Sequence, residues 1–316
     1  MNKTKVLVTG AAGYIATNFI RTLRAELPDA EVVGLDLSAP AAPLEGVDYL
    51  RGDMTTHAWQ QTIIETKPDV VVHLAFILNP MRDERRMHEI NVQGTRNTFK
   101  AAKAAGAKHI VVTSSATVYG AKPDNPVPLT EEHPWDDNQV FQYAQDKAEL
   151  ENYYRDFQAE NPDVRVGIVR PTAVFGPNVD NYLSRFLFAF PFLPVVMGSQ
   201  PRMQIVHEDD VSNFLVCMVE QGAGGIYNVA PDDALDMNEI AELSNRRVVA
   251  LPRILLEKSM RVLWRLGVKR VELPETFLDF AIHPWILSNV KATRELGFKP
   301  QYSSRETLKI MLEHRK

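Results

Sequence analysis

The chain has few residues that could form disulfide bonds or metal clusters. Cys217 is the only cysteine among 316 residues, which excludes an intramolecular disulfide and a cysteine-based metal cluster. It lies in the apolar run FLVC (214–217), where we expect a buried, unreactive thiol. No group of His, Cys and carboxylate residues has metal-ligand spacing, and we interpret His207 of HEDD as a loop-stabilising residue. We therefore expect no metal.

The chain also lacks a long apolar segment and an excess of positive charge. Its most apolar stretch, RFLFAFPFLPVVMG (185–198), is interrupted by Pro191 and Pro194 and is too short to span a bilayer. The first residues, MNKTKVLVTG, contain no apolar signal-peptide region. The formal net charge is −5, without a basic tail, which disfavours a nucleic-acid partner. We expect a cytoplasmic protein with neither a nucleic-acid nor a membrane partner.

What the sequence has is an alternation of apolar runs and longer polar-periodic segments. The runs are almost continuously hydrophobic, as strands buried on both faces of a parallel sheet are; they occupy 5–10, 31–36, 69–76, 109–115 and 164–171. The segments between them have helical periodicity and occupy 14–27, 56–67, 87–106 and 143–160. This repeated order predicts an α/β fold with a doubly wound parallel Rossmann sheet.

The alternation becomes irregular after Gly176 and Pro177. We predict a Rossmann domain over 1–176, rejoined by a strand near 224–231, and a smaller, partly interleaved substrate lobe over 177–316. The amphipathic, basic stretch at 253–270 could bind a membrane surface. We favour the alternative, a helix that packs its Leu, Val and Trp face on the domain.

A glycine-rich turn, GAAGYIA (10–16), follows the first strand directly and opens the first helix. Gly10 allows the tight turn, and Gly13 allows the backbone to approach a pyrophosphate. The helix N-terminus then stabilises the negative charge. Ala16 occupies the third glycine position, where alanine is permitted. The pattern predicts a dinucleotide-binding site.

Asp36 ends the second strand, where a carboxylate would accept hydrogen bonds from an adenosine ribose. The same charge would repel a 2′-phosphate, and no arginine or lysine between Leu37 and Leu50 offsets it. The sequence therefore favours NAD over NADP.

Two further segments carry hydroxyl and amine groups. SSATVYG (114–120) follows the fourth strand, and the carboxyl ends of parallel strands line the ligand crevice. YAQDK (143–147) places Tyr143 and Lys147 on one helix face. By itself this pair could equally be an ordinary surface pair.

The order of these segments resembles that of the extended short-chain dehydrogenase/reductase family, in its NAD-dependent epimerase/dehydratase group. The resemblance covers essentially the whole chain and is carried by TGAAGYIA, the strand end at Asp36, RGDM (51–54), VVHLAF (71–76), NVQGT (91–95), SSATVYG, YAQDK, RPTAVFGPN (170–178), HEDDV (207–211) and ELGFKPQYS (295–303). The group implies NAD as cofactor and homodimers formed through two Rossmann helices, those starting near 87 and 143 here.

The resemblance also assigns roles to residues. Tyr143 matches the catalytic tyrosine, Lys147 its partner, and Ser115 the hydroxyl that holds the substrate oxygen, with Thr117 close enough to share that task. The implied cofactor contacts are Gly10, Gly13, Tyr14, Ile15, Asp36, Asp53, Met54, Leu74, Ala75, Tyr143, Lys147 and Pro171. Holding a free tyrosine as phenolate at pH 7 costs roughly 4 kcal/mol, and we expect the neighbouring ammonium to lower that cost.

The substrate is less well defined. Ala116 and Thr117 stand where dehydratases of the group carry Asp and Glu, so dehydration is disfavoured, and the SSATVYG segment resembles the UDP-galactose 4-epimerase type. Asn178 and Arg202 are the substrate contacts that we predict, although Met203 occupies the position expected for the arginine.

Three functions stay open at this point. The first is sugar-nucleotide epimerisation through a transient ketone. The second is net oxidation or reduction of another alcohol or ketone, for which the apolar segment 185–197 could supply a wall. The third is NAD(H) sensing without catalysis, against which the intact set of Ser115, Tyr143 and Lys147 argues.

Overall fold

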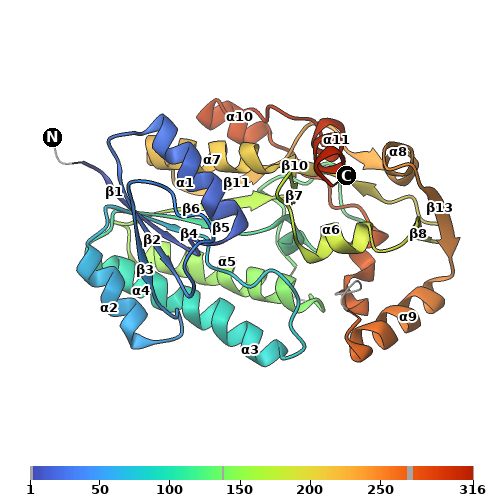
Figure 1. Cartoon of the computed structure of the whole chain (residues 1–316), viewed down its shortest axis with the longest axis horizontal. Coiled ribbons are helices and arrows are strands. Elements are labelled where there is room, and N and C mark those ends of the chain that lie inside the picture. The colour runs from blue at the N-terminus through green and yellow to red at the C-terminus, as the bar shows by residue number, and fades with distance from the viewer. Residues whose placement is uncertain (1–2, 137–138, 269–272, 316) are drawn as a thin grey trace.

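The computed structural model describes residues 3–136, 139–268 and 273–315. Its centre is a parallel sheet of seven strands in the order β3-β2-β1-β4-β5-β6-β11 (Figure 1). Their bounds are β1 (Lys5–Thr9), β2 (Glu31–Asp36), β3 (Val47–Arg51), β4 (Val70–His73), β5 (His109–Thr113), β6 (Arg165–Pro171) and β11 (Gly225–Val229). The strand order reverses between β1 and β4, which makes this edge the place for a ligand. The predicted doubly wound α/β fold is confirmed.

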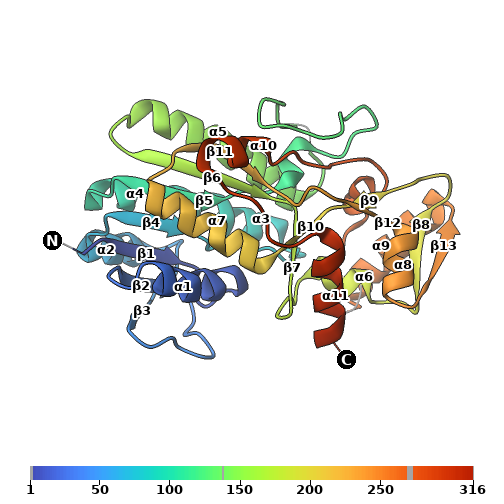
Figure 2. The same ribbon diagram turned by 90° about the horizontal axis from the view of Figure 1, so that it is seen from above.

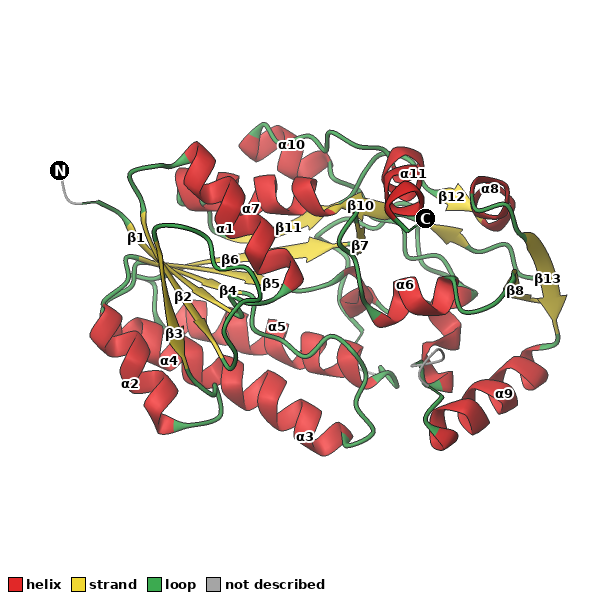
Figure 3. Ribbon diagram, in the orientation of Figure 1, coloured by secondary structure: helices red, strands yellow, loops and turns green. Residues whose placement is uncertain are grey.

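Helices cover both faces of the sheet (Figures 1 and 3). One face carries α1 (Tyr14–Glu26), α7 (Glu208–Gln221) and α10 (Val290–Leu296); the other carries α2 (His57–Thr66), α3 (Glu84–His88), α4 (Gly94–Ala105) and α5 (Gln142–Glu160). Each face has its own buried cluster, with Phe19 and Phe214 in one and Trp59 and Phe99 in the other. Alternating apolar strands and amphipathic helices thus produce two cores around one sheet.

Two features of this domain differ from the sequence prediction. Strand β3 was not expected, because it is an edge strand whose VDYLR residues are mostly half-buried or exposed and form no apolar run. The expected helix at 87–106 is interrupted, since a π-helical turn at Glu89–Gln93 separates α3 from α4. Such turns are frequent at functional sites.

The second half of the chain builds a smaller lobe and also returns to the first, as Figure 2 shows from above. The lobe contains α6 (Tyr182–Leu187), β8 (Phe192–Val196), β9 (Arg202–Met203), β12 (Leu235–Asp236), α8 (Met237–Leu243), β13 (Arg247–Leu251), α9 (Arg253–Leu266) and η3 (Glu275–Ala281). The short pair β7 (Ala173–Phe175) and β10 (Ile205–His207) and helix α11 (Ser304–His314) lie between the two parts. The predicted returning strand is β11, while the division at residue 176 stays a prediction.

Helix α9 packs on the lobe through Met260, which is buried, and leaves several apolar side chains exposed. Residues 269 and 270 of the stretch considered above lie outside the described residues. None of the helices in the described ranges is long and apolar enough to cross a membrane.

His73 at the end of β4 makes the stability of the fold depend on pH. It is buried, with Nδ1 2.7 Å from Thr9 Oγ1 and Nε2 2.9 Å from Thr95 Oγ1. Burial, assisted by the charge of Lys147, lowers the pKa of His73 to about 3. Between that value and the unfolded pKa near 6.5, only the unfolded chain binds the proton.

We therefore expect the free energy of unfolding to fall by a few kcal/mol as the pH decreases from about 6.5 towards 3. Urea denaturation at several pH values measures this slope. His73→Gln should flatten it, whereas the exposed His314→Gln should leave it unchanged. Equal slopes in the two variants would show that His73 is not the responsible group.

Candidate active site

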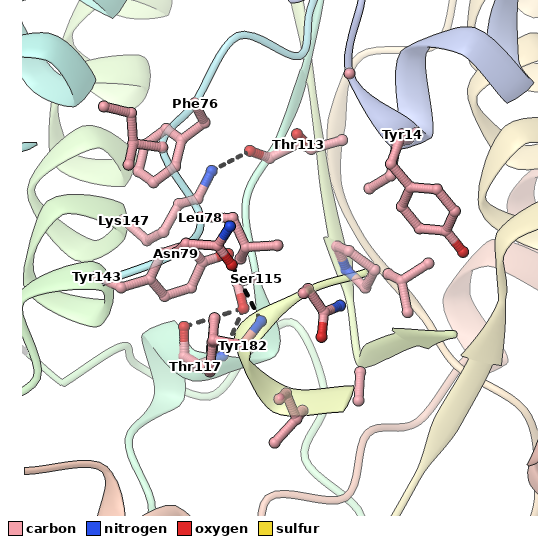
Figure 4. Close-up of a pocket in the computed structure, with 18 of the residues that line it drawn as sticks. Tyr14, Phe76, Leu78, Asn79, Thr113, Ser115, Thr117, Tyr143, Lys147 and Tyr182 are labelled. Carbon is pink, nitrogen blue, oxygen red and sulfur yellow. Dashed lines mark hydrogen bonds between the residues drawn. The ribbon is translucent and has the colours of Figure 1, made fainter. Parts of the chain in front are cut away.

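A cavity of about 420 Å³ lies at the carboxyl ends of the central strands, between the two lobes (Figure 4). The Rossmann side contributes the turn after β1, the segments after β4 and β5, and the helix α5. The second lobe contributes the segment around Tyr182, Phe277 of η3, and Trp285. The cavity is therefore placed where the fold predicts a ligand.

The glycine turn has the geometry of a dinucleotide site. Gly10 has a φ of +70°, and a Cβ there would lie 2.6 Å from the backbone nitrogen of Ala75. Gly13 is the N-cap of α1, and this cap makes no side-chain hydrogen bond to the amides of the first turn within the described residues. These amides are the groups that bind a pyrophosphate. Gly10, Gly13, Tyr14 and Ile15 all line the cavity, as predicted for cofactor contacts.

Gly10→Ala should weaken NADH binding by at least about tenfold, because the left-handed conformation costs about 1–2 kcal/mol and the new methyl group displaces the Ala75 loop. A fluorescence titration with NADH measures the effect. Gly106→Ala is the matched control: its φ is +87°, but no atom lies within 4 Å of the added methyl group. This control should lose stability and retain NADH affinity; equal affinities in both variants would contradict the role of Gly10.

Of the residues predicted for the adenosine end, Asp36 lies near the turn. Asp36 accepts hydrogen bonds from the amides of Ala12 (3.1 Å) and Ser38 (3.0 Å), which hold its carboxylate beside the glycine turn. Asp53 accepts from the amide and hydroxyl of Thr55, and these bonds lower its pKa. Met54 is buried.

Of the other predicted cofactor contacts, Leu74 and Pro171 line the cavity together with Tyr143 and Lys147. Asp36, Asp53, Met54 and Ala75 are not among its lining residues. Their contacts with the cofactor stay predictions.

Lys147 lies deep in the cavity. Its Nζ donates to the carbonyl oxygen of Thr113 at 2.8 Å and lies 3.4 Å from the ring centroid of Phe76 (Figure 4). Burial lowers the pKa of Lys147 to about 7, although Asp146 and Glu151 act in the opposite direction. Burial therefore favours the neutral form of the amine.

Tyr143 is also buried, one helical turn before Lys147, and burial raises its pKa to about 12. A hydrogen bond with Ser115 acts in the opposite direction but does not overcome the burial. The expected lowering by Lys147 is not seen, since its Nζ lies 5.8 Å from the tyrosine ring centroid and is bonded to Thr113. At neutral pH Tyr143 is therefore a neutral phenol that can donate a proton.

Ser115 is oriented by its own neighbours. It caps the short helix η2 (Ala116–Tyr119), and its Oγ accepts from the amide (3.2 Å) and the hydroxyl (3.0 Å) of Thr117. Ser115, Thr117, Tyr143 and Lys147 all line the same cavity. The structure thus brings together the four residues predicted to be catalytic.

A buried ion pair lies close to the segment that carries Ser115 and Thr117. Glu151, one turn after Lys147 on α5, receives two bonds from Arg170 at 2.7 and 2.6 Å, and both side chains are fully buried. Glu151 also accepts from Ser114 (2.6 Å), and Arg170 donates to Tyr119 (2.6 Å). The network joins α5, β6 and the segment that carries Ser115.

Asn178 and Arg202, predicted to contact the substrate, lie outside the lining of this cavity. Asn178 donates to Glu208 at 2.8 Å, and Glu208 also accepts from the hydroxyl of Tyr14. Arg202 is exposed and donates to the carbonyl oxygen of Ala234 at 2.9 Å. Their contacts with a substrate stay predictions.

The apolar segment 185–197 does not line the main cavity either. Phe186, Leu193 and Pro194 line a smaller cavity of about 80 Å³, which shares Leu183, Phe277 and Trp285 with the main one. The segment therefore lies behind Leu183, Phe277 and Trp285, which line the main cavity.

Sequence reasoning missed several lining residues. Phe76 contacts both Lys147 and Tyr143, the latter edge-on at 5.6 Å between ring centroids. Thr172 is buried in the wall, and its Oγ1 has no hydrogen-bond partner among the described residues. Tyr182, Phe277 and Trp285 come from the second lobe. Two of the missed residues had a signal in the sequence: Phe76 follows the predicted contact Ala75, and Thr172 follows Pro171.

Comparison with known proteins agrees with this fold. The sequence model of the NAD dependent epimerase/dehydratase family matches residues 6–230. An N-acetyl-alpha-D-glucosaminyl-diphospho-ditrans,octacis-undecaprenol 4-epimerase from Escherichia coli is 27% identical over 242 residues, covering 74% of this chain and 70% of that protein.

Solved structures of known enzymes have the same fold. The UDP-glucose 4-epimerase of Thermus thermophilus, crystallised with NAD, has a TM-score of 0.76 and 21% identity, covering 98% of each chain. A dTDP-glucose 4,6-dehydratase of Bacillus anthracis, also with NAD, has a TM-score of 0.74 and 16% identity, covering 99% of this chain and 96% of that one.

The chain belongs to the NAD-dependent epimerase/dehydratase family. It is an enzyme of the extended short-chain dehydrogenase/reductase type, and its cofactor is NAD. When bound, NAD supplies a hydride acceptor and donor. Both the family and the cofactor predicted from the sequence are confirmed.

Proposed function

We propose that this enzyme is a sugar-nucleotide 4-epimerase that inverts a secondary alcohol through a transient ketone. The observation that carries the proposal is the convergence of Ser115, Thr117, Tyr143 and Lys147 on one cavity that the glycine turn also lines. The homodimer, the cytoplasmic location and the absence of nucleic-acid partners remain predictions from the sequence.

Each of the four residues has a separate role in the proposed reaction. Ser115 Oγ holds the reacting oxygen at hydrogen-bond distance from Tyr143, and Thr117 keeps Ser115 in that orientation. Tyr143 exchanges the hydroxyl proton, as a base during oxidation and as an acid during reduction. Lys147 adds a positive charge near the site when protonated, which favours the phenolate.

Two features distinguish epimerisation from dehydration. Ala116 and Thr117 provide no acid to protonate a departing hydroxyl. Within the described residues, the only carboxylate side chain that lines the cavity is Asp180, which is 79% exposed and paired with Arg185. Dehydration would need a buried acid close to Tyr143.

A second candidate is the net oxidation or reduction of an apolar alcohol or ketone. The wall opposite the glycine turn favours it, since Tyr182, Leu183, Phe277 and Trp285 are aromatic or aliphatic. Among the described lining residues, Lys147 is the only cation, whereas a sugar nucleotide carries two phosphates.

Purified protein tests the two candidates directly. The epimerase should copurify with NAD, detectable by mass spectrometry, and should interconvert UDP-glucose and UDP-galactose without net absorbance at 340 nm. A net dehydrogenase should instead produce NADH from added NAD. No turnover across a panel of sugar nucleotides would refute the proposal.

Asp36→Arg tests the cofactor preference. The native carboxylate repels a 2′-phosphate and accepts from a ribose hydroxyl, so the native enzyme should bind NADH more tightly than NADPH. The variant should shift the ratio of the two dissociation constants by about tenfold or more towards NADPH. Tighter NADPH binding by the native enzyme would contradict the role of Asp36. Asp48→Arg, on the edge strand β3, is the control and should leave the ratio unchanged.

A further inference from the structure

Helix α9 carries exposed apolar side chains on the face turned away from the protein. Leu255, Val262 and Leu266 are 50, 53 and 73% exposed, and their spacing of seven and four residues places them in one row. We call this row the outer strip. Of the eleven large apolar side chains that are exposed in the described part of the chain, four lie on α9, and Val268 follows its end. The exposure is therefore concentrated on this helix.

A second row of α9 is cationic. Lys258, Arg261 and Arg265 follow one another at spacings of three and four residues, beside the outer strip. Arg261 binds Glu275 of η3 at 2.7 Å, whereas Lys258 and Arg265 form no ion pair with any other described residue. This positive row belongs to a chain whose net charge is −5.

The opposite side of α9 is fixed to the protein. Met260 is buried, and Arg253 binds Asp279 of η3 at 2.9 Å. The sequence offered packing and membrane contact as alternatives, but the structure gives the helix two separate apolar faces. One face packs against the protein, whereas the outer strip remains exposed to solvent.

We propose that α9 is a peripheral docking site for an anionic lipid bilayer. The outer strip enters the boundary between headgroups and acyl chains, while Lys258 and Arg265 contact lipid phosphates. An apolar row flanked by cations is the pattern of helices that lie in the membrane interface, and each surface cation adds to the attraction of anionic lipid. Helix α9 lies at the lower right margin of the molecule in Figure 1, so a flat surface can reach it.

A second copy of the chain fits the outer strip less well than an anionic bilayer does. Two antiparallel copies of α9 related by a two-fold axis would place each cationic row against its counterpart, and like charges at close range repel. A bilayer with anionic headgroups instead neutralises the row.

Docking would also place the active site near the lipid. Helix α9 is bonded to η3, and Phe277 of η3 lines the main cavity. This placement holds whichever alcohol or ketone the enzyme uses.

Cosedimentation with vesicles tests the proposal. The native protein should bind vesicles of mixed phosphatidylglycerol and phosphatidylcholine, and bind pure phosphatidylcholine far less. Val262→Asp combined with Leu266→Asp should lower the partition coefficient by about tenfold or more. Lys258→Glu combined with Arg265→Glu should lower it by at least about tenfold and reduce its dependence on salt.

Val290→Asp on α10 is the matched control, since Val290 is 62% exposed and lies on the other lobe. It should bind vesicles like the native protein, and the thermal unfolding of every variant shows that it is folded. Equal binding to both kinds of vesicle, or no binding, would overturn the proposal. So would self-association in the absence of lipid, measured by sedimentation velocity, if the outer-strip variant abolished it.

Discussion

Replacing Tyr143 by Phe should lower kcat by roughly 10³-fold and leave the affinity for NADH within about twofold. The variant keeps the ring that packs edge-on against Phe76 and loses only the hydroxyl. A positioned acid–base group typically contributes 10²–10⁴ in rate, roughly the effect expected here. Initial rates with the identified substrate, together with an NADH titration, measure both quantities.

Tyr153→Phe is the control for this prediction. Tyr153 lies on the same helix, packs against Phe99 and does not line the cavity. Its variant should keep kcat within about twofold. If Tyr143→Phe retained full activity, the assigned chemistry would be wrong, and a sensing role for NAD(H) would become the better hypothesis.

Removing one partner of the buried ion pair should produce the largest loss of stability. Among the described residues, Arg170→Met leaves the buried carboxylate of Glu151 with Ser114 as its only donor. Uncompensated buried charges of this kind cost about 3–5 kcal/mol. The double variant Glu151→Leu with Arg170→Met removes both charges. It should recover more than half of that loss in the free energy of unfolding.

Urea denaturation of the two single variants and the double variant forms a thermodynamic cycle. Arg253, which forms surface ion pairs with Glu257 and Asp279, is the control, and Arg253→Met should cost less than about 1 kcal/mol for each pair. If the losses of Glu151→Leu and Arg170→Met simply add in the double variant, the two charges do not depend on each other, which would contradict the network described here.

The parts of the fold that the sequence predicts are those in which local pattern and burial agree. The central strands are apolar on both faces, and the glycine turn sits between a strand and a helix, so their positions follow from spacing alone. The sequence does not predict edge strand β3, because much of this strand is exposed to solvent and its residues need not be apolar.

The sequence predicts that the proposed catalytic residues come together, but it does not predict their environment. Tyr143 and Lys147 share one helix, but Phe76, which covers the lysine, comes from a loop about seventy residues earlier. Burial by such distant side chains lowers the pKa of Lys147 to about 7 and raises that of Tyr143 to about 12. The wall of Phe277 and Trp285 likewise depends on how the second lobe folds over the first.

The central claim is that a hydride leaves the substrate and returns to the same carbon. Incubation with UDP-glucose carrying deuterium at carbon 4, followed by mass spectrometry of the UDP-galactose formed, tests it most directly. We expect the product to retain the deuterium, without net NADH. Loss of the label to water, or its accumulation in free NADH, would contradict the proposed epimerisation.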